Sequence, residues 1–394
     1  MPLDIAAVQA SLAAASLDGW LLYDFHGSNP IAQSLAGLTH AAKMTTRRWY
    51  YYIPAAGEPR GLVHAIERHN LDGLPGTMQP YAGRASLDEG LDAMLAGASR
   101  IAMEYSPGCD IPYLSRVDAG TFESVRQRGV TVVSSGDLVQ QFEAVWTPVQ
   151  IATHEAASAA LYRIKDRAFE VLRTVATGGE TITEYALQQQ MVDWFANEGL
   201  ISSDPPVVAV MANAGNPHYL PTASSHQPIG RDQLVLLDLW AKQAALGAVY
   251  ADITWVAYTG ATVPPEMARA FDSIARARDT AVSAVQAALD AGRYARGFEV
   301  DRAAREVLVH DGYADVILHR TGHSLGESVH GNGAHLDDYE TRDERQLLPG
   351  SGFTIEPGLY FPTFGVRTEI NVVILGTEAR VSGPRQAAIT TLAH

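Results

Sequence analysis

Residues 235–256 read VLLDLWAKQAALGAVYADITWV, two apolar runs joined by the link KQAALGA. Both runs have the composition of β-strands, and Gly247 in the link suits a turn, so the stretch predicts a β-hairpin. Each run contains one acid, Asp238 in the first and Asp252 in the second. Burying an ionised carboxylate without a partner is very costly. The two acids therefore either point outward beside the turn or face a positive charge.

The spacing of the two aspartates favours a cation between them. A turn centred on Ala245 would place Asp238 directly opposite Asp252, on one face of the hairpin, with Cβ atoms about 4.5–5.5 Å apart. Carboxylates held that close repel, and one of them must take up a proton unless a cation neutralises the pair. A divalent metal ion removes the conflict. The alternative is that both acids only keep the hairpin soluble.

Three histidines follow in a segment that also contains glycines, HRTGHSLGESVHG at 319–331: His319, His323 and His330. A neutral imidazole can bind a metal or carry a proton, and glycines allow the backbone to approach closely. One such histidine alone is usually structural. Three in so short a stretch favour a functional site.

Two glutamates occupy unusual positions in strand-like runs. Glu356 ends the apolar run of FTIEPGLYF (353–361), and Glu369 lies within GVRTEINVVIL (365–375). Glutamate is uncommon in strands and rarely buried without a partner, although either residue could face solvent from a half-exposed strand. Together with His323 and the two hairpin aspartates, these glutamates form a ligand set that suits two divalent ions such as Mn²⁺, Co²⁺ or Zn²⁺. A pair of such ions is typical of hydrolases.

The sequence before the hairpin indicates a smaller domain. Strand-like runs (WLLYDF, RRWYYYIP and RIAMEY) alternate with helix-like segments in the first third of the chain, which predicts an α/β domain. The pair Thr147-Pro148 then opens a helical stretch that runs to about residue 177. We therefore expect an N-terminal domain at 1–147 and a C-terminal domain at 148–394.

The order of predicted helices and strands repeats in the C-terminal part. A long helix, a shorter helix and strand-like runs after residue 148 are followed by the same order of elements from a second long helix at 264–291. Two helix pairs outside a curved sheet would explain this order.

The composition excludes several classes of protein. The 394 residues are 47% hydrophobic and 19% charged, as in a soluble globular protein. A net charge of −15 argues against binding to nucleic acid or to an anionic membrane surface. Neither a signal peptide nor a transmembrane helix is expected. The single cysteine, Cys109, has no activating base in sequence and fits a reducing compartment, so the expected location is cytoplasmic.

The order Asp, Asp, His, Glu, Glu, with the last three in GHSLGESVH, FTIEPG and GVRTE, resembles the metal-dependent proline peptidases of the pita-bread fold. This family includes prolidases (Xaa-Pro dipeptidases) and Xaa-Pro aminopeptidases. The resemblance covers about residues 150–390. It implies an α+β fold class: a C-terminal pita-bread (creatinase/aminopeptidase) domain with a curved antiparallel sheet and outer helix pairs, preceded by a smaller α/β creatinase-type domain.

The resemblance also implies a role for each candidate ligand. Asp238 and Asp252 would bind one of two divalent ions (Mn²⁺, Co²⁺ or Zn²⁺), with Asp252 bridging to the second. His323 would complete the second metal site, and Glu369 would bridge the two ions. Glu356 would bind metal and also take the proton from the attacking water.

Further residues would surround the substrate. His218, in NAGNPHY, resembles the family's first active-site histidine, near the residue that precedes the proline. His330 resembles the second, which contacts the scissile carbonyl or the carboxylate of the product. Arg367 resembles an arginine that steadies the site. Spacing alone adds Tyr219 and Trp255, with Arg367, as candidates for the proline pocket.

The implied activity is that of a dinuclear metallopeptidase in which a metal-bridging hydroxide attacks the Xaa-Pro bond, most simply in dipeptides. The nearest alternative is an Xaa-Pro aminopeptidase that acts on longer peptides, and another is a non-catalytic peptide-binding member of the fold. Methionine aminopeptidase and creatinase fit less well, because the first needs no N-terminal domain and the second works without metal. The resemblance further implies a homodimer, in which HGSNPIAQSLAG (26–37), expected to be a loop, could reach the partner's active site.

The chain departs from the family pattern at several positions. The thirteen residues between the two aspartates make an unusually long link. Ser324 stands where a glycine is common, Gly331 follows His330 in place of a glutamate, and Ile370 follows Glu369 in place of an aspartate. None of these departures removes a ligand. They surround the expected pocket and therefore bear on substrate preference.

Overall fold

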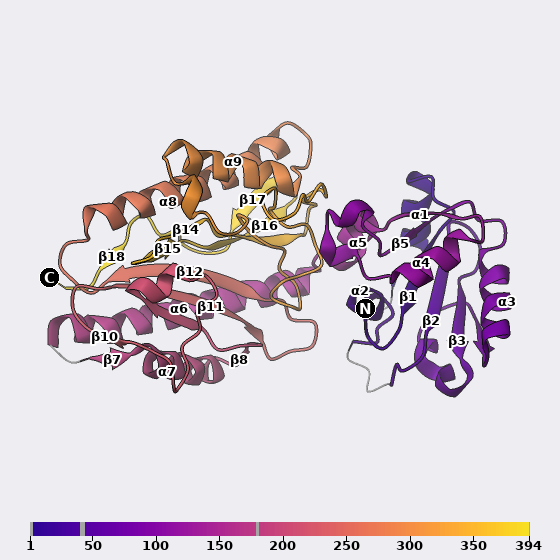
Figure 1. The fold of residues 1–394 in the computed structure, drawn as a ribbon, viewed down its shortest axis with the longest axis horizontal. Coiled ribbons are helices and arrows are strands. Elements are labelled where there is room, and N and C mark those ends of the chain that lie inside the picture. The colour runs from indigo at the N-terminus through magenta and orange to yellow at the C-terminus, as the bar shows by residue number, and fades with distance from the viewer. Residues whose placement is uncertain (1–2, 40–43, 179–180, 394) are drawn as a thin grey trace. The chain divides into compact units, whose positions relative to one another are not determined.

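The computed structural model describes residues 3–39, 44–178 and 181–393, and the chain divides into two units after Glu143 (Figure 1). The N-terminal unit comprises Met1–Glu143 and the C-terminal unit Ala144–His394. Among the described residues, no helix is long and apolar enough to cross a membrane.

A six-stranded mixed sheet forms the centre of the N-terminal unit, in the order β4-β3-β2-β1-β5-β6. Every residue of β1 and β2 is buried, because helices cover both faces: α1, α2 and α5 pack on one face, and α3 and α4 pack on the other. The strands are β1 Gly19–Asp24, β2 Trp49–Pro54, β3 Arg60–His64, β4 Thr77–Tyr81, β5 Arg100–Met103 and β6 Thr131–Ser134. The helices are α1 Ile5–Ala14, α2 Pro30–Leu35, α3 Arg84–Leu95, α4 Ala119–Arg126 and α5 Gly136–Glu143.

Two helix pairs enclose the strands of the C-terminal unit, as the repeated order of elements predicts (Figure 1). One pair, α6 and α7, shares a core with one face of the hairpin, and the other pair, α8 and α9, shares a core with the opposite face. The long helices expected from residue 148 and at 264–291 are both confirmed. The four helices are α6 Pro148–Gly178, α7 Glu184–Asn197, α8 Pro265–Asp290 and α9 Gly297–His310.

The strands of this unit form several small sheets. One has the order β18-β12-β11-β8, with β9 also paired to β11; a second has the order β13-β16-β17; β14 pairs with β15 and β10 with β7. Apart from the parallel pair β12–β18, these pairings are antiparallel. The strands are β7 Ile182–Thr183, β8 Leu200–Ile201, β9 Val207–Val210, β10 Pro228–Ile229, β11 Leu234–Gln243, β12 Ala251–Tyr258, β13 Gly352–Ile355, β14 Gly358–Tyr360, β15 Gly365–Arg367, β16 Ile370–Leu375, β17 Glu378–Val381 and β18 Thr390–Thr391.

The predicted hairpin is formed by β11 and β12, and its residues alternate between the two cores. Leu237 and Leu239 belong to the core shared with α6 and α7, whereas Leu236 belongs to the core shared with α8 and α9. Because side chains along a strand alternate with a period of two, Asp238 and Asp252 point to the same side as Leu236. We call this side the site face of the hairpin.

The register of the hairpin differs from the predicted one. Asp238 lies opposite Thr254, and Asp252 lies opposite Trp240. The expected direct pair of aspartates is wrong because the ladder is centred on Leu246, one residue later than predicted, and this moves every partner by two residues. A shift of two residues keeps each side chain on its face, so the aspartates remain diagonal neighbours.

Two further predictions are corrected. The stretch 26–37 is not a continuous loop, because it contains helix α2, whose first turn is capped where the side chain of Asn29 accepts the N–H of Ala32 at 3.0 Å. Glu369 lies between β15 and β16 rather than within one strand. The chain changes partners there, since β15 pairs with β14 but β16 pairs with β13.

Candidate metal centre

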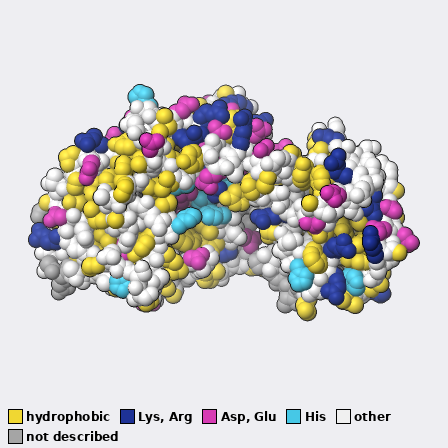
Figure 2. Space-filling model, viewed as in Figure 1, with side chains coloured by type: hydrophobic (Ala, Val, Ile, Leu, Met, Phe, Trp, Pro, Cys, Tyr) yellow, Lys and Arg dark blue, Asp and Glu magenta, His cyan; other side chains and the backbone are white. Residues whose placement is uncertain are grey.

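Three buried side chains from separate elements converge in the C-terminal unit. Asp252 on β12, His323 in the loop after α9 and Glu369 between β15 and β16 each bring one potential ligand atom within 4.8 Å of the others. Figure 2 shows histidine and acidic side chains gathered in a hollow of this unit. These residues are three of the five predicted ligands.

The imidazole of His323 has the tautomer that a metal ligand needs. Its Nδ1 donates to the carbonyl oxygen of Ser324 at 3.1 Å, which leaves the lone pair of Nε2 free. Nε2 lies 3.7 Å from Oδ2 of Asp252 and 3.4 Å from Oε1 of Glu356. Burial lowers the pKa of His323 to about 3, so the ring is neutral at physiological pH. A neutral ring that faces two carboxylates with a lone pair is suited to share a cation with them.

The backbone around His323 is tightly fixed against β13. The N–H of His323 donates to Oγ1 of Thr354 at 3.0 Å, and the N–H of Thr354 donates to the carbonyl of His323 at 2.8 Å. A Cβ atom on Gly322 would lie 2.1 Å from the carbonyl oxygen of Thr354. Only glycine permits this approach, which sets the distance between the histidine loop and the strand.

Glu356 follows the last residue of β13, as predicted, and extends the cluster. Its Oε1 accepts from the hydroxyl of Thr354 at 3.3 Å. The side chain retains 15% of its exposure, against 4% for that of His323. Glu356 and Asp238, whose side chain is 13% exposed, are therefore the more open carboxylates of the cluster, since that of Asp252 is only 7% exposed.

Asp238 joins the cluster through Arg367 and Thr254. Nη2 of Arg367 donates to Oδ2 of Asp238, and Nε of Arg367 donates to the hydroxyl of Thr254 at 3.0 Å. That hydroxyl oxygen lies 3.2 Å from Oδ1 of Asp238 and 2.7 Å from Oε2 of Glu369. Thr254 thus links the first and the last predicted ligands, and Arg367 partly neutralises the acids.

The electrostatics of the site fit a divalent cation. Burial and the charges of neighbouring carboxylates raise the pKa of Asp252 and of Glu369 well above their usual values. Burial also raises the pKa of Asp238, although Arg367 opposes this effect. Within the described part of the chain, the buried Oδ1 of Asp252 has no hydrogen-bond partner. A cation bound by these oxygens would relieve both the repulsion and the unpaired acceptor.

The two histidines predicted to meet the substrate lie beside this cluster. The ring of His330 is 4.3 Å from that of His323 and nearly perpendicular to it, and His330 is exposed. The neighbouring His323, together with partial desolvation of the ring, lowers the pKa of His330 to about 4, and His218 contributes to the same shift. His218 is also exposed. Both side chains are therefore accessible from solvent near the candidate ligands.

Tyr219 is tied to a buried acid. Its hydroxyl donates to Oε2 of Glu184 at 2.5 Å, and the same glutamate accepts the N–H of Val210 at 2.7 Å and of Gln227 at 2.7 Å. The hydroxyl therefore anchors the segment that carries His218.

Trp255 lies on the wrong face to line the predicted proline pocket. Its ring packs against α6, with Nζ of Lys165 at 4.1 Å from the ring centroid and Tyr162 in an edge-on contact at 6.0 Å. The prediction fails because Trp255 is one residue from Thr254 in the strand, and adjacent residues point to opposite faces.

Arg367 is held by a chain of hydrogen bonds through Tyr360 and His319. The sequence did not reveal this chain. Nη1 of Arg367 donates to the hydroxyl of Tyr360 at 3.0 Å, which in turn donates to Nε2 of His319 at 2.6 Å. Nδ1 of His319 donates to the carbonyl of Arg320 at 2.7 Å. The first of the three clustered histidines thus holds the arginine and is not a ligand.

Asn371 and Thr254 are two further residues that the sequence reading missed. The buried side chain of Asn371 accepts the N–H of Asp252 at 2.9 Å and donates to its carbonyl oxygen, which fixes the backbone of that candidate ligand. Strand alternation would have identified Thr254, because it is two residues from Asp252. No local pattern marks Asn371, since its partner is distant in sequence.

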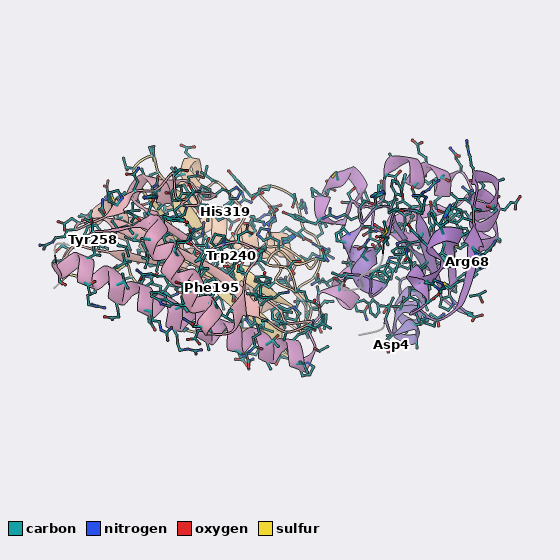
Figure 3. The ribbon with its side chains drawn as sticks, turned by 90° about the horizontal axis from the view of Figure 1, so that it is seen from below. Asp4, Arg68, Phe195, Trp240, Tyr258 and His319 are labelled. Carbon is teal, nitrogen blue, oxygen red and sulfur yellow. The ribbon has the colours of Figure 1, made fainter. Side chains whose placement is uncertain are left out.

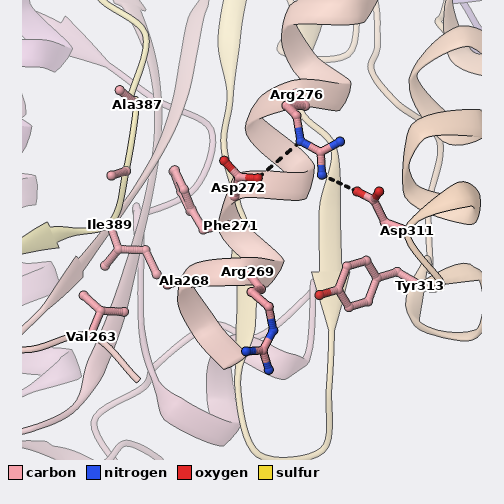
Figure 4. Close-up of a pocket in the computed structure, with 11 residues that line it drawn as sticks. Val263, Ala268, Arg269, Phe271, Asp272, Arg276, Asp311, Tyr313, Ala387 and Ile389 are labelled. Carbon is pink, nitrogen blue, oxygen red and sulfur yellow. Dashed lines mark hydrogen bonds and ion pairs between the residues drawn. The ribbon is translucent and has the colours of Figure 1, made fainter. Parts of the chain in front are cut away.

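A separate pocket of about 640 Å³ lies between the first half of α8, Tyr313 and the segment 387–389 (Figure 4). Of the two arginines that line it, Arg276 is paired with Asp272 at 3.2 Å and Asp311 at 2.5 Å. The pocket contains none of the candidate ligands, so it is not the chemical site.

A comparison with protein families matches residues 152–375 to the family described as metallopeptidase family M24. Among curated proteins, the "Probable dipeptidase PepE" of Mycobacterium tuberculosis is 27% identical over 256 residues, which cover 64% of this chain and 62% of that protein. The Xaa-Pro dipeptidase of Lactobacillus delbrueckii subsp. lactis is 30% identical over 204 residues, 51% of this chain and 49% of that one. The matched stretch therefore spans less than two thirds of the length of either relative.

Solved structures match over nearly the whole chain. The dipeptidase PepE from Mycobacterium ulcerans has a TM-score of 0.73 at 23% identity and covers 99% of this chain and 97% of its own. The recombinant prolidase from Thermococcus sibiricus has a TM-score of 0.66 at 21% identity, with 98% of each chain covered. This likeness confirms the predicted fold class, an α/β N-terminal part followed by a pita-bread part.

Proposed function

Because the chain belongs to metallopeptidase family M24, we propose that it is an Xaa-Pro dipeptidase that uses two divalent ions per chain. The observation that carries the proposal is the buried cluster of Asp252, His323 and Glu369, with Nε2 of His323 only 3.4 Å from Glu356. The names of the relatives, dipeptidase and Xaa-Pro dipeptidase, support the class of substrate.

Four acids and one imidazole of the cluster would hold the metal: Asp238, Asp252, His323, Glu356 and Glu369. Carboxylate oxygens and one neutral nitrogen suit Mn²⁺, Co²⁺ or Zn²⁺. When bound, such ions would supply Lewis acidity to the water and the carbonyl that react.

Glu356 has the geometry of the residue that moves the proton. Its carboxylate is partly open and is oriented by the hydroxyl of Thr354. It would accept a proton from the attacking water as the new carbon–oxygen bond forms, and deliver it to the proline nitrogen as the carbon–nitrogen bond breaks. The tertiary amide nitrogen must be protonated to leave, so both transfers are required.

His330 and His218 would contact the substrate around the scissile bond. Both rings are exposed beside the cluster and can donate hydrogen bonds through a ring N–H. A donor aimed at the carbonyl oxygen stabilises the negative charge that develops there. Arg367, held between Asp238 and Tyr360, would steady the acids, and Tyr219 would keep His218 in place through Glu184.

The test is a panel of peptides with and without added Mn²⁺, Co²⁺ and Zn²⁺. We expect metal-dependent hydrolysis of Xaa-Pro dipeptides and much slower hydrolysis of the matched Xaa-Ala dipeptides. Equal rates on both series, or full rates after chelation, would contradict the proposal.

A second candidate is an Xaa-Pro aminopeptidase, because the exposed rings of His330 and His218 do not close the site to a longer peptide. Leu-Pro and Leu-Pro-Gly, compared in one assay, separate the two activities. A clear preference for the tripeptide would assign the enzyme to the aminopeptidases.

We also propose the domain bounds and the oligomeric state. The catalytic domain would span 148–394 and the creatinase-type N-terminal domain 1–147, in a homodimer. The only cysteine of the chain, the exposed Cys109, is free and suits the cytoplasm.

A further inference from the structure

The segment SLGESVHG (324–331), which we call the His330 loop, follows His323 and folds back on itself. Its two ends meet where the N–H of Gly331 donates to the carbonyl oxygen of Ser324 at 2.8 Å. A Cβ atom on Gly331 would lie 2.8 Å from the carbonyl carbon of Leu325 and 2.9 Å from Oγ of Ser324. Glycine therefore permits this closure, and the loop projects as one compact turn.

The two halves of the His330 loop differ in burial. Leu325, in the first half, is 1% exposed, and its N–H donates to a carbonyl oxygen of β13 at 2.9 Å. In the second half Glu327 and His330 are exposed, and Val329 is only partly buried against the core that contains Leu325. The ring of His330 nevertheless lies 4.3 Å from the ring of His323. The place of this exposed ring therefore depends on what holds the outer part of the loop.

The hairpin binds the outer part of the loop at two consecutive peptide groups. Lys242 lies on the site face of the hairpin, two residues after Trp240, which is labelled in Figure 3. Nζ of Lys242 donates to the carbonyl oxygen of Glu327 at 2.6 Å. The N–H of Tyr250 donates to the carbonyl oxygen of Gly326 at 2.9 Å. The strand that carries Asp238 and the loop that carries His330 are thus joined directly.

The ammonium group of Lys242 is itself held in place. It lies 5.2 Å from the centroid of the Tyr250 ring, a distance at which a cation is attracted to the ring. That ring is 5% exposed, and its hydroxyl accepts the N–H of Ser203 at 3.1 Å. A charged donor also makes a stronger hydrogen bond to a carbonyl than a neutral donor does. Lys242 is therefore a fixed contact for Glu327.

We propose that Lys242 is a positioning residue: by holding the carbonyl of Glu327, it keeps His330 directed at the scissile carbonyl of the substrate. Lys242 does not touch the substrate and acts only through His330. This inference rests on the proposed Xaa-Pro dipeptidase function, in which His330 contacts the substrate. A displacement of about 1 Å in such a contact can cost on the order of 100-fold in rate.

The test compares three variants in hydrolysis of Leu-Pro by the metal-loaded enzyme. Lys242→Met keeps a stem of similar length and loses the ammonium group. We expect kcat to fall about tenfold with little change in KM, because a hydrogen bond to the carbonyl oxygen strengthens as charge develops there. Lys242→Arg keeps a cationic donor and should recover most of the loss. Gln243→Met is the matched control, since the same new side chain points to the opposite face of β11, and its kinetics should be unchanged.

A double-mutant cycle shows whether Lys242 acts through His330. In a His330→Ala background, Lys242→Met should cause no further loss of kcat, because the group that it positions is already absent. A further tenfold loss in that background would overturn the proposal. Loss of bound metal in Lys242→Met would overturn it too, since the role would then lie in the structure of the metal centre.

Hydrogen exchange of the backbone amides gives a readout that does not need catalysis. Exchange in the peptide that contains residues 324–331 should be faster in Lys242→Met than in the wild type and unchanged in Gln243→Met. Equal exchange in the wild type and Lys242→Met would overturn the proposal.

The two proposals fail in different ways. If the wild-type protein does not hydrolyse Leu-Pro, the proposed function is wrong, and faster exchange in Lys242→Met still supports the hold of Lys242 on the loop. If the wild type hydrolyses Leu-Pro and Lys242→Met does so equally well, only the role of Lys242 is wrong.

Discussion

Oδ2 of Asp252 lies 3.7 Å from Nε2 of His323, although one residue belongs to a hairpin strand and the other to the loop after α9. The pair is buried, and the histidine is neutral because burial lowers its pKa to about 3. The contact therefore gains no ion-pair attraction at physiological pH. A cation held between the carboxylate and the ring would give this arrangement a favourable energy.

Replacing Asp252 by asparagine removes one anionic ligand and keeps the size of the side chain. We expect activity on Leu-Pro to be lost, beyond the roughly 10–100-fold that removal of an outer partner costs. The bound metal should fall below two ions per chain while circular dichroism stays native. Full activity in this variant would sink the two-metal account.

Thr254→Val tests the residue that links Asp238 to Glu369. The valine has nearly the same shape but lacks the hydroxyl that lies 2.7 Å from Oε2 of Glu369. We expect metal affinity or kcat/KM to fall roughly 10–100-fold, measured by chelator competition and by steady-state kinetics. Thr254→Ser should recover most of the loss. If serine and valine behave alike, the hydroxyl has no role.

Gly322→Ala tests how closely the histidine loop must approach β13. The new Cβ would lie 2.1 Å from the carbonyl oxygen of Thr354, so the loop must move and carry His323 with it. We expect weaker metal binding and a loss of about 1–3 kcal/mol in the free energy of unfolding. Gly326→Ala is the control, because its nearest neighbour is 3.6 Å away. Equal effects of both substitutions would contradict the explanation.

The sequence predicted those features of the fold and the site that depend on residues close together in the chain. It predicted the hairpin, the long helices and the acids that end up near His323, because acids inside apolar strands and histidines among glycines are locally unusual. It also placed Asp238 and Asp252 on one face, since strand alternation survives an error of two residues in register.

The sequence was uninformative where a residue's role depends on a partner far along the chain. Arg367 pairs with Asp238, and Asn371 binds the backbone of Asp252 by hydrogen bonds. Both contacts join separate elements of the fold. Spacing alone assigned Trp255 to the proline pocket, but the alternation of side chains along β12 turns it toward α6. The register of the hairpin is set by the centre of its turn, and that centre depends on how the link KQAALGA packs.

His154 predicts a dependence of stability on pH that is independent of the metal ligands. Its Nδ1 donates to the carbonyl of Tyr250 at 2.8 Å, and Nε2 accepts from the hydroxyl of Ser382 at 2.9 Å. Burial lowers the pKa of His154 from 6.5 to about 4. Between these values the unfolded chain binds the proton more tightly, so the free energy of unfolding falls as the pH decreases through this window.

The lowered pKa of His154 determines the size of this pH dependence and how it can be tested. Above pH 6.5 neutral His154 makes its full contribution to the free energy of unfolding. By pH 4 about 3 kcal/mol of that free energy is lost. Urea unfolding at pH 7 and pH 5 should show a smaller difference for His154→Gln than for the wild type, because glutamine does not titrate. An identical difference for both proteins would show that His154 does not titrate as proposed.

The number of divalent ions that restore activity to metal-free protein tests the central claim most directly. Metal is removed with a chelator, Mn²⁺ is added back in steps, and bound metal and Leu-Pro hydrolysis are measured on the same samples. We predict negligible hydrolysis without metal and full activity at two ions per chain. Full hydrolysis by protein that elemental analysis shows to be metal-free would contradict the account.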